Sequence, residues 1–199
     1  MGLFDSILKS AGNALKNEAS KAVSNAASSI GKGKNHTESF TFTALPSSLA
    51  ELQAMPEASL DSAFKTTALT IAVLCAYEKN PDGCIEMLNF LTGPAEVSTY
   101  EKGFIKERLS GKFYKTFSFF EGATPENGYK PNTPFVINVS ENPYSFDEEN
   151  WATLYVTSGG ADNPRPIKLR KKPSTGQWFL NDIQCLADIR VPVADDPWA

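Results

Sequence analysis

The chain has 199 residues, of which 41% are hydrophobic and 21% are charged, so it can bury a core and is not a disordered protein. The formal net charge of −4 excludes a protein that holds nucleic acid by bulk positive charge, and we expect no nucleic-acid partner. The charge is unevenly spread. Residues 1–37 hold five lysines against two carboxylates, a net charge of +3, which leaves −7 on residues 38–199.

Apolar residues recur along the first thirty positions with the spacing of an α-helix. From Phe4 to Ile30 they stand three or four residues apart, while the opposite face is rich in lysine, asparagine and serine. The pattern predicts an amphipathic helix over residues 1–30 and a glycine-containing linker over residues 31–38. The side chains predicted to bind a membrane or a partner are Leu3, Phe4, Ile7, Leu8, Lys9, Leu15 and Lys16.

The sequence leaves three destinations open for this helix. It can lie in a lipid interface with its apolar face immersed, pair with a helical protein partner such as a second copy, or pack on its own domain. We expect no transmembrane segment, because the longest uncharged apolar-rich run, residues 66–77, would extend about 18 Å as a helix against a hydrocarbon core of about 30 Å. No signal-peptide pattern is present, so we expect a cytoplasmic protein, at the inner face of the membrane if the helix binds lipid.

Residues 39–199 are predicted to form a single α+β domain. Ser39–Thr43 alternates apolar and polar residues, which is typical of a short strand. Helical patterns follow over residues 47–53, 60–79 and 84–91. A capping box formed by Ser98 and Glu101 opens a further helix that ends near residue 110.

From about residue 113 the pattern changes to strands. Aromatic and β-branched runs separated by turns predict strands to about residue 191, the last three of them in a meander. Helices gathered before strands predict a helical layer packed on a C-terminal antiparallel sheet. The predicted strands cover residues 114–120, 134–139, 152–157, 166–171, 177–180 and 185–191.

One predicted strand carries the densest basic patch of the chain. Its apolar residues Ile167 and Leu169 alternate with cations, so we expect one face to be buried and the other to be wet and positively charged. The patch is a candidate site for an anion or an acidic partner, or else a solvated edge strand whose charges prevent strand addition. It consists of Arg165, Lys168, Arg170 and Lys172.

No motif in the sequence predicts a catalytic residue, a metal site or a cofactor. The single histidine, His36, falls in the predicted linker, which is a poor place for a rigid catalytic group. Cys75, Cys84 and Cys185 have no C-x-x-C spacing and are interpreted as small buried residues. No glycine-rich phosphate loop is present.

The C-terminal stretch resembles a family of bacterial proteins without known activity. The resemblance rests on the Ile-Arg-Val-Pro run at residues 189–192 and the Asp-Pro-Trp-Ala ending at residues 196–199. It implies a bacterial cytoplasmic protein and brings no site residues with it.

Two hypotheses for function follow from the sequence. The first is a non-enzymatic protein whose N-terminal helix associates with a membrane surface or a protein partner. The alternative is an α+β domain with a pocket between helices and sheet, walled by Trp151 or Trp178, that binds a small ligand or acts as an enzyme. In the alternative, the N-terminal helix packs over the mouth of the pocket.

Overall fold

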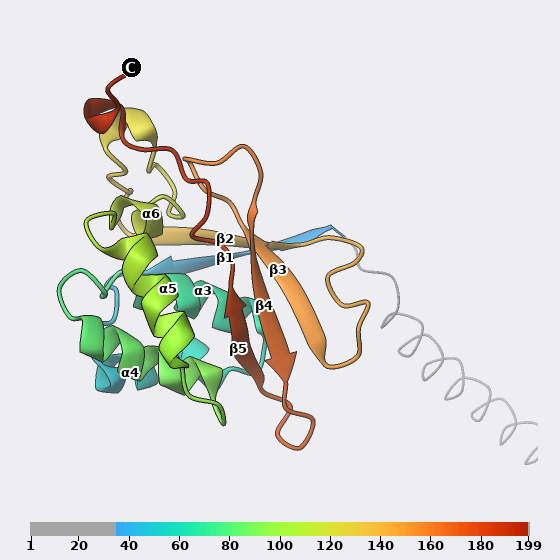
Figure 1. Cartoon of the computed structure of the whole chain (residues 1–199). Coiled ribbons are helices and arrows are strands. Elements are labelled where there is room, and N and C mark those ends of the chain that lie inside the picture. The colour runs from blue at the N-terminus through green and yellow to red at the C-terminus, as the bar shows by residue number, and fades with distance from the viewer. Residues whose placement is uncertain (1–34, 199) are drawn as a thin grey trace, which may run out of the picture.

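The computed structural model describes residues 35–198, so the helix predicted over residues 1–30 lies outside the described residues. Within them the fold is α+β, as predicted: helices between residues 49 and 117 pack on one face of a five-stranded antiparallel sheet (Figure 1). No helix in this part of the chain is long and apolar enough to cross a membrane.

The sheet is a simple meander in which each strand pairs with the next along the chain. All five strands confirm predicted ones to within about three residues at either end. The first strand begins at His36, which pairs with Glu141, so the end of the predicted linker is already part of the sheet. The strands are β1 (His36–Phe42), β2 (Phe135–Glu141), β3 (Trp151–Val156), β4 (Arg165–Lys171) and β5 (Trp178–Ile183).

The helices that begin at Leu49 and Thr99 follow the predicted starts, whereas the helix predicted over residues 60–79 spans only Ala63–Leu74. The helix predicted over residues 84–91 begins earlier, at Pro81, because Asn80 caps it and proline suits the first helical position. Ser48 caps the first, and the predicted capping box is present, since the backbone N–H of Ser98 donates to Glu101 Oε2 at 2.7 Å and that of Glu101 donates to Ser98 Oγ at 3.2 Å. The α-helices are α2 (Leu49–Gln53), α3 (Ala63–Leu74), α4 (Pro81–Thr92), α5 (Thr99–Leu109) and α6 (Tyr114–Phe117). The 3-10 helices are η1 (Pro56–Ser59), η2 (Pro125–Asn127) and η3 (Val193–Asp195).

The core lies between α3 and the sheet. Helix α3 is buried along almost its whole length, and Leu154 of β3 and Ile167 of β4 are fully buried on the facing side of the sheet. In β4, Ile167 and Leu169 are buried while Lys168 and Arg170 are exposed, which confirms the predicted alternation. The outer face of the sheet therefore meets solvent, as one face of an antiparallel sheet commonly does.

Residues 114–120 form a helical turn, so the strand predicted there is wrong. Helix α6 buries Lys115 and Thr116, and its aromatic neighbours pack on each other, with 6.1 Å between the ring centroids of Phe117 and Phe120. Only Phe120 reaches the sheet, through an isolated bridge to Ile137. Packing of aromatic residues in the tertiary structure overrides their local preference for strands here.

The strand predicted at residues 185–191 is also absent from the described structure. Asp188 has a φ of +49°, a left-handed conformation that interrupts an extended chain. The backbone N–H of Arg190 donates to the Gly160 carbonyl at 2.9 Å, and Arg165 Nη2 donates to the Asp188 carbonyl at 2.7 Å. These bonds hold the segment against the loop before β4 instead of beside β5, and β5 is left as the last strand of the sheet.

Candidate functional site

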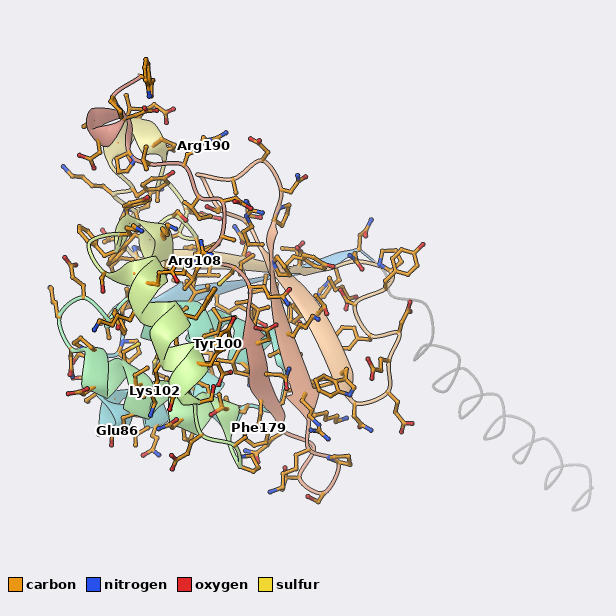
Figure 2. All side chains as sticks on the ribbon, viewed as in Figure 1. Glu86, Tyr100, Lys102, Arg108, Phe179 and Arg190 are labelled. Carbon is orange, nitrogen blue, oxygen red and sulfur yellow. The ribbon has the colours of Figure 1, made fainter. Side chains whose placement is uncertain are left out.

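A groove of about 310 Å³ runs between helix α5 and strand β5. In Figure 2, Tyr100 and Arg108 lie on the side of α5 that faces β5, and Phe179 lies near the lower end of the groove. The groove combines an apolar helical wall with the backbone of an edge strand. Its lining residues are Thr92, Val97, Tyr100, Glu101, Phe104, Ile105, Leu180, Asn181, Asp182, Ile183, Gln184 and Ala187.

The helical wall is a row of side chains spaced four residues apart. Tyr100, Phe104 and Arg108 fall on one side of α5 because residues four apart lie one above the other on a helix. The guanidinium carbon of Arg108 lies 5.3 Å from the centre of the Phe104 ring. Ile105 and Leu109 point into the core and are buried, whereas Tyr100 is 82% exposed. Two aromatic rings are therefore available to a ligand in the groove.

The strand wall has free backbone groups. The N–H of Trp178 turns away from β4 and donates to the Leu60 carbonyl at 2.8 Å, while Thr66 Oγ1 donates to the Trp178 carbonyl at 2.8 Å. Because backbone direction alternates along an antiparallel strand, Leu180 turns its N–H and C=O the same way, toward the groove. Among residues 35–198, no group outside the sheet hydrogen bonds to the backbone of residues 179–183. Exposed edges of this kind are normally covered or blocked.

A cationic extension of about 430 Å³ continues the groove toward the turn between β4 and β5. The two parts share Thr92, Glu101, Leu180 and Asn181. The extension is lined by three consecutive cationic residues, 170–172, and by the carboxylates Glu96 and Glu101. The guanidinium of Arg170 itself lies over Trp151 on the outer face of the sheet. In the described part of the chain none of the three cations forms a salt bridge with a carboxylate.

The backbone groups of Trp178 that face away from β4 are taken by Leu60 and Thr66, and the loop after α4 packs on the ring of the next residue, Phe179. Gly93 has a φ of +68°, and a Cβ placed on it would overlap the Phe179 ring. Only glycine allows the loop to come this close to the ring in that conformation. The free edge of β5 therefore begins at Leu180.

A second group of cations lies at the other end of α5. Lys115 is only 8% exposed, and its Nζ makes one hydrogen bond, to the Leu186 carbonyl at 3.3 Å. Burial lowers the pKa of Lys115, and the charges of Lys112 and Arg108 lower it further. Arg108 Nε is buried without a hydrogen-bond partner in the described residues. These cations lie at the C-terminal end of α5, outside the lining of the groove.

The structure assembles only part of the basic patch predicted from the sequence. Arg170 and Lys172 line the cationic extension of the groove. Lys168 is exposed on the outer face of the sheet, and Arg165, at the far end of β4, is bound by Asp188 with 3.8 Å between Nη2 and Oδ2. The residues predicted to bind a membrane or partner, Leu3 to Lys16, lie outside the described residues.

Neither tryptophan predicted to wall a pocket lines this groove. Trp151 lies on the outer face of the sheet beneath Arg170, whose guanidinium carbon is 5.1 Å from the ring centre. Trp178 packs edge-on against Phe146, with 5.7 Å between ring centroids. A pocket between helices and sheet is therefore found at α5 and β5 instead of at the predicted tryptophans.

The nucleophilic side chains of the described chain are poorly placed for chemistry. Burial raises the pKa of the Cys75, Cys84 and Cys185 thiols to about 12, so their reactive thiolate forms are scarce at neutral pH. His36 lies on β1, with its Nε2 3.3 Å from Glu38 Oε1. Residues 35–198 contain no group of three or more side chains suited to hold a metal ion.

The sequence predicts the apolar residues of α5 but does not predict that Tyr100 and Phe104 line a groove. Tyr100 and Phe104 share the helix with the core residues Ile105 and Leu109, and spacing alone does not separate the two pairs. One signal in the sequence could have indicated the groove. This short helix has four apolar residues, more than a single buried stripe needs.

Comparison with known families assigns the chain to one family. A family model described as a domain of unknown function (DUF6935) matches residues 44–193. The chain belongs to the DUF6935 family. All residues that line the groove fall inside the DUF6935 match, as does the Ile-Arg-Val-Pro run, while residues 1–43 and the Asp-Pro-Trp-Ala ending fall outside it. Comparisons with curated proteins and with solved structures found no match.

Proposed function

We propose that the DUF6935 domain of this chain is a non-enzymatic binding module that takes an extended polypeptide segment into the groove between α5 and β5. The observation that carries the proposal is the free edge of β5, which opens into a groove walled by aromatic side chains. An added strand gains backbone hydrogen bonds from such an edge, and its alternate side chains enter the adjacent pockets.

The shape of the groove favours a polypeptide over a small molecule. Its two parts are continuous along β5 and pass from an apolar region at Phe104 and Leu180 to a cationic one at residues 170–172. An extended segment follows both parts, whereas small-molecule sites are concave and bury most of their ligand. Tyr100 and Phe104 supply the kind of aromatic surface that dominates binding energy at interfaces.

The test uses a library of random nonapeptides displayed on phage and selected on the full-length chain. We expect selected peptides to bind the wild type and to lose at least about tenfold in affinity to Phe104→Asp, because a carboxylate in the apolar part of the groove is costly to desolvate. Lys102→Asp, an exposed position on α5 outside the groove lining, is the matched control. Selected peptides that bind Phe104→Asp as well as the wild type would show that the groove is not the site.

We also propose, as a second function, that residues 1–30 bring the domain to an anionic membrane surface, at the inner face of the membrane. The support is the charge division of the chain, +3 on residues 1–37 and −7 on residues 38–199, together with the apolar side chains in the first half of the amphipathic pattern. An anionic surface attracts the segment and repels the body, which favours contact through the segment alone. A helical protein partner is the alternative.

Flotation of the full chain with phosphatidylcholine–phosphatidylglycerol vesicles tests this second function. The double variant Phe4→Ser with Leu8→Ser is expected to remain at the bottom of the gradient while the wild type floats. The variant loses most of the apolar surface that would enter the membrane interface, and its charge is unchanged. The control Asn13→Ser with Asn17→Ser alters the polar face and should float like the wild type. Equal flotation of the wild type and the Phe4/Leu8 variant would contradict the assigned face. A wild-type chain that does not float would favour the helical partner.

A further inference from the structure

The last described residues, Asp196–Trp198, follow η3 and end in an unpacked tryptophan. Val191 is 42% exposed, Val193 is 44% exposed and Trp198 is 93% exposed. Asp195 and Asp196 place two carboxylates between the valines and the indole ring. Tryptophan is among the residues that contribute most to interfaces, and an indole left in water is a candidate anchor for a partner surface.

This segment cannot reach the groove of its own molecule. Figure 1 shows η3 at the end of the molecule that holds η2, with the C-terminal end pointing away from α4 and α5. Only three described residues follow η3, and three residues span at most about 11 Å. A groove that takes the segment must therefore belong to another molecule.

We propose that the last described residues of one copy of this chain, Asp196–Trp198 beyond η3, occupy the α5–β5 groove of a second copy. The inference rests on the proposed function, which it deepens by naming the polypeptide that the groove takes. A reciprocal exchange of segments closes a dimer, whereas insertion in one direction builds larger assemblies.

The charges of the two surfaces are complementary. Asp195 and Asp196 of one copy lie against the cationic extension of the groove, where Lys171 and Lys172 form no salt bridge within the described residues. Ion pairs of this kind set the register of a segment along a groove and increase its rate of association.

The apolar residues and the backbone of the segment also fit the groove. Trp198 matches the apolar part, where the rings of Tyr100 and Phe104 are available for packing. Asp196, with φ −87° and ψ 112°, is already extended, because the residue before a proline avoids the helical region. An extended backbone is what the free edge at Leu180 requires of an added strand.

Sedimentation velocity of the full-length chain, over protein concentrations from micromolar to millimolar, tests the inference. The wild type is expected to self-associate as concentration rises, and Trp198→Ala to need at least about tenfold more protein for the same shift, because the anchor is removed. Tyr144→Ala removes another exposed aromatic ring, 76% exposed, and should behave like the wild type. Phe104→Asp, which blocks the groove, should weaken association as Trp198→Ala does.

Mixing the two weakened variants gives the sharpest readout. Trp198→Ala keeps an intact groove and Phe104→Asp keeps an intact segment, so one productive contact remains in the mixed pair, and association should recover on mixing. A wild type that stays monomeric at every concentration, self-association unchanged by Trp198→Ala, or no recovery on mixing would each overturn the inference. A monomeric wild type that still binds selected nonapeptides through the groove would leave the proposed function standing.

Discussion

Replacing Leu154 by alanine is expected to lower the free energy of unfolding by about 2–5 kcal/mol, the range found for a fully buried leucine. Leu154 lies within the central strand β3, pairs with Ile167 of β4 and has no exposed surface. Truncation leaves a cavity beneath α3 that neither the packed helix nor the paired strands can fill. Urea unfolding followed by circular dichroism measures the loss as a lower midpoint.

The matched control for this prediction is Thr153→Ala, one residue earlier on the same strand. Thr153 points to the outer face of the sheet and is half-buried, so its truncation removes little core packing. We expect it to change stability by less than about 1 kcal/mol. Equal losses for the two variants would contradict the assignment of the inner and outer faces of the sheet.

Raising the pH above about 8.5 is expected to destabilise the fold steeply. Cys84 and Cys185 have no exposed surface, and burial raises the pKa of each thiol to about 12. Between about pH 8.5, where an unfolded thiol ionises, and pH 12, only the unfolded state releases these protons. Stability contributed by the buried thiols is complete below that window and falls within it, by about 1.4 kcal/mol per pH unit for each thiol.

Other groups modify this alkaline transition in known directions. Burial raises the pKa of Tyr129 to about 12, which adds to the loss above about pH 10. The lowered pKa of Lys115 acts in the opposite sense, because the unfolded state holds that proton more tightly and stability rises with pH through its titration. Urea midpoints at pH 8 to 10 for the wild type and for Cys84→Ala with Cys185→Ala isolate the thiols. A slope that is unchanged in the double variant would show that the thiols are not responsible.

Four of the five α-helices and all five strands could be predicted because their signals are local. Caps such as Ser98 with Glu101, and the alternation around Ile167 and Leu169, depend only on neighbouring residues. Residues 114–120 failed because their aromatic residues suit a strand as well as a packed helical turn, and only the tertiary contacts decide between them. The left-handed conformation of Asp188 carries no strong signal in the sequence.

The groove could not be predicted because it exists only where no other segment covers the outer edge of β5. The sequence predicts a strand at residues 185–191, which would have paired with β5 and hidden its edge. The bonds from Arg190 to Gly160 and from Arg165 to Asp188 join segments far apart in the chain and draw that stretch away. The cations of β4 adjoin in sequence but point to opposite faces of the sheet, because side chains alternate along a strand.

Amide hydrogen exchange of the full-length chain tests most directly whether the edge of β5 is free to bind. The N–H of Leu180 faces the groove without a partner, so it should exchange far faster than the N–H of Leu154 inside β3, and become protected when a selected nonapeptide is added. A Leu180 amide that is already as protected as that of Leu154 in the protein alone, or that stays unprotected with the peptide bound, would contradict the account.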